Sequence, residues 1–428
     1  MREEESMPKQ KDISIKESLK NPNLCKVRTI TSFITLGKDN TQWEKIIFDA
    51  ADFCNNLSEK IKKKGYTVQS LRMVTNPYGE YLDTSSSKAA LRRMSILKRV
   101  LQSNKMPKTR IRFAIGEARN KQDLSVLPSL IKVQGDLANA CINIPIDELG
   151  VPDNTLTLAS AKIVKKISKS TPHGQGNFNF CVNYNCPSYI PYFPPSYHRS
   201  EQRSCFAIGF ETPDLLVEAL KCLGLHKNKV QKNHNETRKE AFAIMKSALQ
   251  YHADFIVKLA LDFSKNKSFT FLGIDSSAAP SKECTSLGEL YHLLGVEYFG
   301  AAGTIETSAF LTRLFKSIKK VNLIGFSGLM LALTEDKGLA LGTEKRQFDI
   351  RSLLMNSAVC GIGLDTVPIA GDTSVDKIAS LMRDTGTLAF RLNKPLMVRL
   401  FPVPGLKAGD LTTFDSKDLC NCRVLDTY

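Results

Sequence analysis

The stretch that decides the fold class runs from Val27 to Thr75 and contains a strand, a helix and a second strand in succession. Residues 27–34, which read VRTITSFI, alternate in the manner of a strand. Residues 41–64 carry an apolar stripe at helical spacing, and Gly65 ends this predicted helix. Residues 66–75 return to a strand pattern. Two neighbouring strands joined by a helical crossover run parallel, so this unit predicts an α/β fold.

The same alternation of strand and helix continues along the chain. Further strands are predicted at residues 109–115, 138–144, 178–184, 204–210, 269–274, 296–299, 321–325, 361–365 and 395–401. Further helices are predicted at residues 87–101, 123–132, 155–169, 214–223, 237–263, 286–294, 304–320, 349–357 and 375–388. This order predicts a largely parallel sheet. A single large α/β barrel accommodates the strands without long exposed edges, and an open doubly wound sheet is the alternative.

Composition narrows the class of protein and the compartment. Residues 1–24 are polar and predict a mobile leader, whereas residues 25–428 read as one barrel-like domain. No apolar run reaches about 18 residues, so an integral membrane protein is not expected. The eleven cysteines and six histidines show no metal-ligand spacing. Unpaired cysteines fit a reducing compartment, so we expect a cytoplasmic protein without a metal or another cofactor.

The net charge of +16 favours anionic partners. The basic residues are dispersed over several predicted helices, however, and no nucleic-acid-binding motif accompanies them. Solvated helix faces explain such clusters, so nucleic-acid binding is the weaker alternative to binding of a small polar metabolite.

Carboxylates that follow predicted strands are the first candidates for chemistry, because parallel α/β folds bind ligands where strands end. Glu211 follows the strand at 204–210, and Asp275 follows the strand at 269–274 with Ser276 and Ser277 after it. Asp365 ends the glycine-containing strand at 361–365. These carboxylates predict general acid–base catalysis, with the two hydroxyls holding substrate. The alternative is that they cap helices or shape turns.

Two further segments supply the other candidates. Residues 299–307, FGAAGTIET, join a strand to a helix, and we expect Gly303 and Thr304 to contact a ligand, with Glu306 as a fourth catalytic carboxylate. Thr304 could instead only cap the helix. The irregular stretch 174–203 is rich in proline and aromatic residues, and its Tyr197 and His198 are candidates for substrate binding and proton transfer.

Cys360 precedes the strand at 361–365 and is a candidate contact or nucleophile, although a lone buried cysteine more often only packs.

Several of these motifs resemble those of the domain-of-unknown-function family 711, also called uncharacterised protein family 0210. The matching residues are the Gly300–Gly303 turn with Thr304, the loop at 325–328, and Cys360 to Asp365 with Pro368, Asp372 and Thr373. Residues 176–194, Tyr197 with His198, and residues 206–211 also resemble one branch of that family. The resemblance implies a fold similar to the barrel of pyruvate formate-lyase-like glycyl radical enzymes. It does not extend to radical chemistry, because the C-terminal residues 401–405, FPVPG, do not match the radical glycine motif.

Three function classes therefore stay open. The first is a cofactor-independent enzyme that acts on a small amino- or carboxyl-bearing metabolite, more in keeping with a lyase, isomerase or hydrolase than an oxidoreductase. The second is a non-catalytic sensor that uses the same pocket, and the third is a nucleic-acid-binding protein. The sequence leaves a homodimer open.

Overall fold

The computed structural model describes residues 16–103, 106–107, 109–199, 203–225 and 234–428, and it shows a mixed α/β fold built on one nine-stranded sheet. The strands are β1 (Lys26–Ile34), β2 (Leu71–Thr75), β3 (Ile111–Ala118), β4 (Asn139–Ile144), β5 (Phe180–Tyr184), β6 (Cys205–Glu211), β7 (Thr270–Asp275), β8 (Gly363–Ala370) and β9 (Leu396–Val403). The helices are α1 (Trp43–Lys62), α2 (Ser87–Leu101), α3 (Lys121–Gln134), α4 (Asn154–Ser170), α5 (Pro213–Lys221), α6 (His234–Ser264), α7 (Leu287–Leu293), α8 (Thr304–Lys316), α9 (Lys337–Glu344), α10 (Ile350–Ser357) and α11 (Val375–Arg391).

The predicted elements agree with this assignment in kind and order except at three places. The predicted strand at 296–299 is wrong, because these residues form turns after α7. The predicted strand at 321–325 is reduced to a single bridge at Leu323. Helix α9 was not predicted, because its eight residues offer little more than two turns of pattern. Pro128 lies inside α3 without ending it. In addition, β8 extends to Ala370, so Asp365 lies near the start of this strand and not at its end as predicted.

The order of strands across the sheet is β7-β6-β1-β2-β3-β4-β5-β9-β8. Strands β1 to β5 are joined by helices α1 to α4 and run parallel. The pairs β6–β7 and β8–β9 are each parallel within themselves, but β6 pairs antiparallel with β1 and β9 pairs antiparallel with β5. The sheet therefore consists of a central group of five strands flanked by two pairs of opposite direction.

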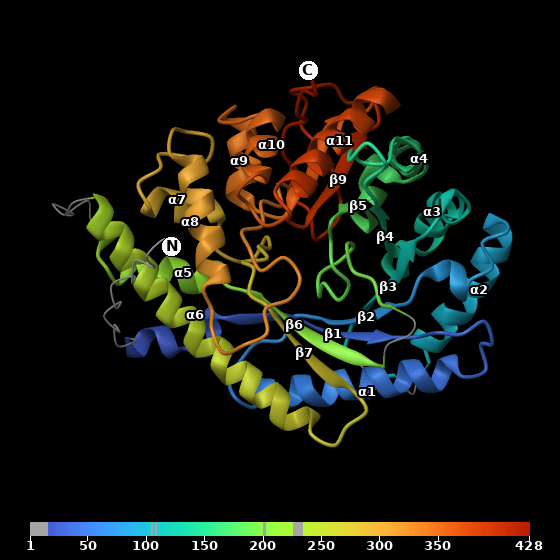
Figure 1. Ribbon diagram of the computed structural model, residues 1–428, viewed down its shortest axis with the longest axis horizontal. Helices are drawn as coiled ribbons and strands as arrows, with labels where there is room; N and C mark the ends of the chain where they lie inside the picture. Colours follow the sequence, from blue (N-terminus) through green and yellow to red (C-terminus); the bar gives the residue numbers. More distant parts are fainter. Residues whose placement is uncertain (1–15, 104–105, 108, 200–202, 226–233) are drawn as a thin grey trace, which may run out of the picture.

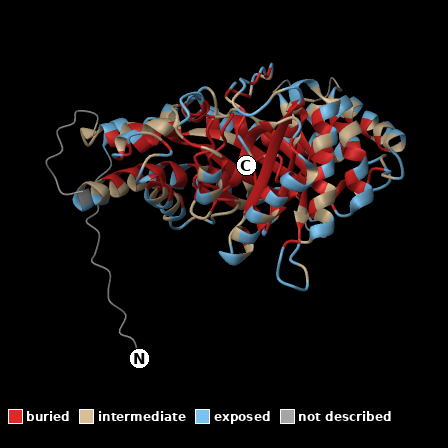
Figure 2. Ribbon diagram, turned by 90° about the horizontal axis from the view of Figure 1, so that it is seen from above, coloured by how far each residue is buried: buried red, intermediate tan, exposed pale blue. Residues whose placement is uncertain are grey.

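The helices form an outer ring around the strands (Figure 1). Figure 2 shows the strands as the buried centre and the helices with exposed outer faces. The main core lies between the strands and this ring. A second, smaller core lies on the other face of the sheet, where Phe33, Val74 and Ala207 pack with Tyr189 and Phe193 of the segment between β5 and β6. Irregular chain thus fills the inside of the barrel.

One segment, residues 321–334, spans the two edges of the sheet. Leu323 bridges to Ile274 of β7, and Ala332 bridges to Asp365 of β8. Residues 324–331, between these two bridges, form no strand, so no continuous ladder of hydrogen bonds closes the barrel within the described part of the chain. The prediction of a large α/β barrel-like fold is confirmed. Residues 321–334, here called the seam segment, lie between the edge strands β7 and β8, which do not pair with each other directly.

The part of the predicted leader that the structure describes, residues 16–24, forms two short 3₁₀ turns with Leu19 fully buried. The rest of the predicted leader, residues 1–15, lies outside the described residues. His252 of α6 holds the described part: its Nε2 lies 2.9 Å from the Leu19 carbonyl oxygen, and its Nδ1 lies 2.8 Å from the Tyr66 hydroxyl. Because a carbonyl can only accept, Nε2 carries the proton and Nδ1 accepts from Tyr66.

We expect this contact to make stability depend on pH. Burial lowers the pKa of His252 from its usual value of 6.5, so the folded state favours the neutral imidazole. A lowered pKa stabilises the fold above the unfolded value, and that contribution is lost as pH falls from 6.5 towards the folded pKa. Thermal unfolding measured from pH 8 to pH 5 should show this loss in the wild type and less of it in His252→Gln. Equal slopes would contradict the assignment.

Candidate functional site

The site with the strongest chemistry is a cavity inside the barrel, here called the inner cavity. It measures about 50 Å³ and is lined by charged residues of four strands and of the turn before α9, together with apolar side chains. The charged residues are Arg28 of β1, Arg72 of β2, Asp365 of β8, Arg399 of β9 and Glu335. A volume of this size holds a few water molecules or a few heavy atoms.

Three of these charged residues form a tight ion-pair network. The Nε of Arg399 lies 2.6 Å from Oδ1 of Asp365, and its Nη2 lies 2.6 Å from Oε1 of Glu335. Its Nη1 donates to the Phe178 carbonyl at 3.3 Å, and its guanidinium lies 4.8 Å from the centre of the Phe178 ring. All three guanidinium nitrogens of Arg399 are therefore engaged, and Arg399 fixes both carboxylates in place.

Arg28 extends the network towards the end of β6. Its guanidinium lies 4.0 Å from Oε2 of Glu335 and 3.5 Å from Oε2 of Glu211. Glu211 in turn lies 3.0 Å from the ammonium of Lys26. Each charged residue that lines the inner cavity, with one exception, therefore has a partner of opposite charge.

The exception is Arg72. It is buried, with 6% of its surface exposed, yet within the described part of the chain no carboxylate lies within ion-pair distance of it. Its Nε donates a long hydrogen bond of 3.3 Å to Ser70, and its guanidinium lies 5.0 Å from the centre of the Phe193 ring. The aromatic face offsets part of the cost of burying a cation. Both terminal nitrogens remain for a ligand.

The protonation equilibria follow from this arrangement. Burial raises the pKa of Asp365 to about 6, although Arg399 opposes the shift. Burial, together with Arg112 and Arg28, lowers the pKa of Arg72 to about 9. Arg72 is therefore still a cation at neutral pH, while Asp365 changes protonation state close to neutrality. These two properties suit an anion anchor and a proton-transfer group.

Asp365 is the only predicted site residue that the structure places in the lining of the inner cavity. Glu211, at the end of β6, is buried and touches the network only through Arg28 and Lys26. Its position is explained by these ion pairs.

Asp275, Ser276 and Ser277 hold the seam segment instead of lining the inner cavity. The carboxylate of Asp275 accepts hydrogen bonds from the backbone of Phe326 at 2.8 Å and of Ser327 at 3.0 Å. It also accepts from both the backbone and the hydroxyl of Ser277. The Ser276 hydroxyl donates to the Phe315 carbonyl at 2.8 Å. These contacts are those of a structural support for the loop that begins at Gly325.

Gly325 shows how closely that loop approaches. It has a φ of +62°, and a Cβ at this position would lie 2.2 Å from Oδ2 of Asp275. Both the left-handed backbone and the lack of space require glycine. The loop and the carboxylate therefore form one unit.

The remaining predicted residues lie away from the inner cavity. Glu306 is exposed on α8, with its carboxylate 3.9 Å from Nη2 of Arg238. Thr304 donates to the Ala301 carbonyl and accepts from Gly300, while Gly303 is the residue that precedes α8, so both shape the start of this helix. The last three predicted site residues, His198, Tyr197 and Cys360, are each buried in packed surroundings.

Their contacts are local. The His198 ring packs against Tyr189 with 5.6 Å between ring centres, and the Tyr197 hydroxyl donates to the Cys186 carbonyl at 3.0 Å. The thiol of Cys360 accepts a weak contact from the Gly363 backbone at 3.5 Å. None of the three lines the inner cavity.

The position of each carboxylate along its strand explains why the predicted carboxylates do not converge. Glu211 and Asp275 are the last residues of β6 and β7. Asp365 instead lies near the start of β8, which runs in the same direction as β6 and β7. Sequence reasoning also missed Arg72 and Arg399, although a charged residue inside an apolar strand, as in LRMV and VRLF, is a usable signal.

We predict that Asp275 matters for stability far more than Glu306. Asp275→Ala should lower the free energy of unfolding at pH 7 by roughly 3 kcal/mol, because the backbone groups of Phe326 and Ser327 lose their acceptor in a buried place. The matched change Glu306→Ala should stay within about 0.5 kcal/mol, since its side chain is 64% exposed. Chemical denaturation of both variants tests this. Similar values would show that Asp275 does not support the loop.

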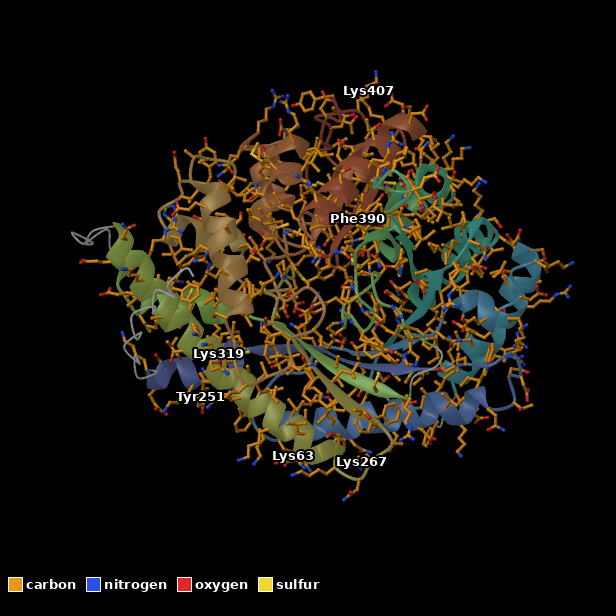
Figure 3. All side chains as sticks on the ribbon, viewed as in Figure 1. Lys63, Tyr251, Lys267, Lys319, Phe390 and Lys407 are labelled. Carbon is orange, nitrogen blue, oxygen red and sulfur yellow. The ribbon has the colours of Figure 1, made fainter. Side chains whose placement is uncertain are left out.

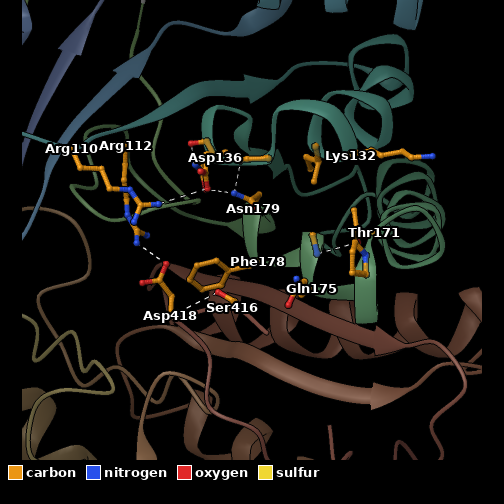
Figure 4. A pocket seen from close by; sticks show the side chains of 15 residues that line it. Arg110, Arg112, Lys132, Asp136, Thr171, Gln175, Phe178, Asn179, Ser416 and Asp418 are labelled. Carbon is orange, nitrogen blue, oxygen red and sulfur yellow. Dashed lines mark hydrogen bonds and ion pairs between the residues drawn. The ribbon is translucent and has the colours of Figure 1, made fainter. Parts of the chain in front are cut away.

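A second pocket opens at the surface near the same charged network, and Figure 4 shows its lining. This outer pocket measures about 290 Å³ and is bounded by the starts of β3, β4 and β5, the turn after α4 and the C-terminal segment. Arg110, just before β3, points towards Asp136, and Arg112 of β3 points towards Asp418 (Figure 4). The Phe178 ring lies beside Ser416 and Asp418 (Figure 4). The polar lining is typical of a site for a polar ligand.

The residues that the structure describes contain no group of three or more His, Cys, Asp or Glu side chains arranged to hold a metal ion. Their helices include none with the length and apolar character needed to cross a membrane.

Comparison with known proteins gives one consistent result. A family model described as "Uncharacterised ACR (DUF711)" matches residues 19–416. A UPF0210 protein of Carboxydothermus hydrogenoformans is 26% identical over 91% of this chain and 88% of its own length. UPF0210 proteins of Thermoanaerobacter sp. and Pyrobaculum arsenaticum are each 28% identical, over 68% and 59% of this chain and 64% and 54% of their own lengths. The predicted family is thereby confirmed.

Proposed function

The chain belongs to the uncharacterised DUF711 family, and from that premise and the inner cavity we propose that it is an enzyme of small carboxylate metabolism. In this proposal Arg72 binds the carboxylate of the substrate, and Asp365 transfers a proton to or from it. Arg399 and Glu335 orient these groups. The proposal keeps the predicted acid–base chemistry but moves it from the strand ends to the inside of the barrel.

The observation that carries the proposal is the guanidinium of Arg72. A buried cation without a carboxylate within ion-pair distance is costly, and the contact with Phe193, the long hydrogen bond to Ser70 and the more distant charge of Glu335 offset only part of this cost. Two free terminal nitrogens match the two oxygens of a carboxylate, and such bidentate pairs are among the strongest hydrogen bonds in proteins. A buried arginine whose two terminal nitrogens are free to donate hydrogen bonds is what we expect of an anion-binding site.

Asp365 supplies the chemistry next to this anchor. Its pKa of about 6 lets it exist in both protonation states near neutral pH, which general acid–base catalysis requires. Its bond to Arg399 fixes the direction of the carboxylate. Glu335, with 14% of its side chain exposed, adds a second negative charge that suits an ammonium group. An amino acid therefore satisfies both signs of charge.

The size of the cavity limits the substrate. About 50 Å³ suits a molecule, or the head of a molecule, of a few heavy atoms. The labelled lysines in Figure 3 are spread from Lys63 and Lys267 at the bottom to Lys407 at the top. This dispersed positive charge agrees with a small ligand better than with nucleic acid. No single basic face collects them in this view.

A thermal-shift screen tests the proposal. The library should contain small monocarboxylates, dicarboxylates, amino acids and the corresponding amines that lack the carboxylate. A true ligand at about 100 times its Kd stabilises the folded state by roughly 2.7 kcal/mol. We expect carboxylates to stabilise the protein and the matched amines to have no effect.

Turnover of the stabilising compound then separates an enzyme from a sensor. Consumption of the compound, followed by NMR, supports the enzyme. Stabilisation without turnover would replace it by the non-catalytic alternative with the same pocket. Amines that stabilise as well as the acids would contradict the role of Arg72.

A further inference from the structure

The inner cavity and the outer pocket share a wall. Phe178 lines the outer pocket, while its ring packs on the guanidinium of Arg399, which lines the inner cavity. Arg112 lines the outer pocket and is the register partner of Arg72 on the neighbouring strand. The charge of Arg112 is close enough to lower the pKa of Arg72. The pairs Phe178–Arg399 and Arg112–Arg72 thus separate the outer pocket from the inner cavity.

The outer side of this wall is held by the C-terminal segment. Asp418 lies 2.6 Å from Nη2 of Arg112. On either side of it, the Thr413 hydroxyl lies 3.0 Å from Nδ1 of His173, and the Leu419 carbonyl accepts from Lys282 at 2.7 Å. The segment therefore crosses this end of the barrel, with the Arg112–Asp418 pair in the outer pocket (Figure 4).

The carboxylate of Asp418 occupies the position on Arg112 that the carboxylate of a small molecule would take. Arg112 and Asp418 are partly exposed, at 24% and 36% of their side chains, so water and solutes reach the pair. Exposed ion pairs contribute little to stability, and a competing anion can displace one partner at low cost. The cation behind it, Arg72, has no such partner among the described residues.

We propose that the outer pocket is the access site for anionic ligands of the inner cavity, with Phe178 and the Arg112–Asp418 pair as its gate. A carboxylate first exchanges with Asp418 on Arg112, and displacement of the Phe178 ring then opens the way to Arg72. The outer pocket accommodates the part of the substrate that the inner cavity cannot hold. The inference rests on the proposed function only in taking the inner cavity as the ligand site.

Charge-selective labelling tests the route without any substrate. Met330 lines the inner cavity and is buried, so Met330→Cys places a thiol there. Two methanethiosulfonate reagents of similar size are compared, one with a sulfonate and one with a trimethylammonium group. The thiolate forms a disulfide with the reagent and sulfinate leaves, and mass spectrometry follows the peptide that contains residue 330. Native Cys222, which is partly exposed, serves as the internal control in the same sample.

We expect the anionic reagent to label the thiol of the Met330→Cys variant about tenfold faster than the cationic one, since a cationic passage concentrates anions. The preference should shrink in about 0.5 M salt, where the screening length is only a few ångströms. Asp418→Asn and Phe178→Ala should each speed the anionic reaction about tenfold, the effect of easing opening by 1.4 kcal/mol. Asp410→Asn, in the same C-terminal segment but away from the pocket, should leave the rate unchanged.

Equal rates for both reagents, or rates unaffected by Asp418→Asn and Phe178→Ala, would overturn the proposal. So would the absence of labelling at residue 330 in every variant while Cys222 reacts. Ala332→Cys, which also lines the inner cavity, is the second probe if the first variant does not fold. The labelling result stands whether or not the thermal-shift screen finds a ligand, so failure of the route and failure of the proposed function are distinguished.

Discussion

Replacement of Arg72 by methionine is expected to stabilise the ligand-free protein and to abolish ligand binding. Methionine keeps most of the length of the side chain and its contact with Phe193, but it removes a buried charge that has no carboxylate partner in the described structure. Replacing buried charged groups by apolar ones of similar volume stabilises proteins by up to roughly 1–4 kcal/mol. Most point substitutions destabilise a protein, so the sign of the change is informative.

The measurement is a pair of denaturation curves with and without the carboxylate found by the screen. Arg72→Met should show a higher midpoint without ligand and no ligand-dependent shift. Arg72→Lys, which keeps the charge but loses the planar fork, should bind at least about tenfold more weakly than the wild type. Arg391→Met, at an exposed position in the last turn of α11 and in the lining of neither pocket, is the control and should change neither property. A destabilised Arg72→Met variant that still responds to ligand would refute the anchor role.

Replacement of Asp365 by asparagine is expected to reduce kcat by about 10²–10⁴-fold, the usual contribution of a general acid or base. The amide oxygen of asparagine can still accept the hydrogen bond from Nε of Arg399, and Arg399 keeps Glu335 as its ionic partner. The fold should therefore remain within about 1 kcal/mol of the wild type. Loss of turnover without loss of structure is the signature of a chemical role.

The pH profile of kcat adds a second test of Asp365. If it acts as a base, kcat rises with pH through a value of about 6, and if it acts as an acid, kcat falls through the same value. Asp365→Asn should remove this inflection. Glu306→Gln is the control among the carboxylates predicted from the sequence, and it should retain both the rate and the profile because it lies on the exposed surface of α8. Full activity in Asp365→Asn would end the assignment.

Much of the fold was predictable because local patterns report local structure. Helix α2 begins and ends at the predicted residues, and β1 and β4 begin within one residue of the prediction, since each shows a clear period bounded by polar or turn residues. The segment at 321–325 was harder to predict, because its apolar pattern is compatible both with a strand and with a loop that lies between two strand edges. Only the position of Gly325 against Asp275 decides between them.

The candidate site was predictable only in part. The α/β class, the family and the candidacy of Asp365 could all be inferred from the chain, because strand periodicity, glycine turns and a carboxylate after apolar residues are local properties. The location of Asp365 near the start of β8, while Glu211 and Asp275 end β6 and β7, became visible only in the folded sheet. So did the contrast between Arg72, which has no counter-ion among the described residues, and Arg399, which has two. Charge pairing depends on contacts between residues far apart in the chain, and no periodicity in the sequence encodes them.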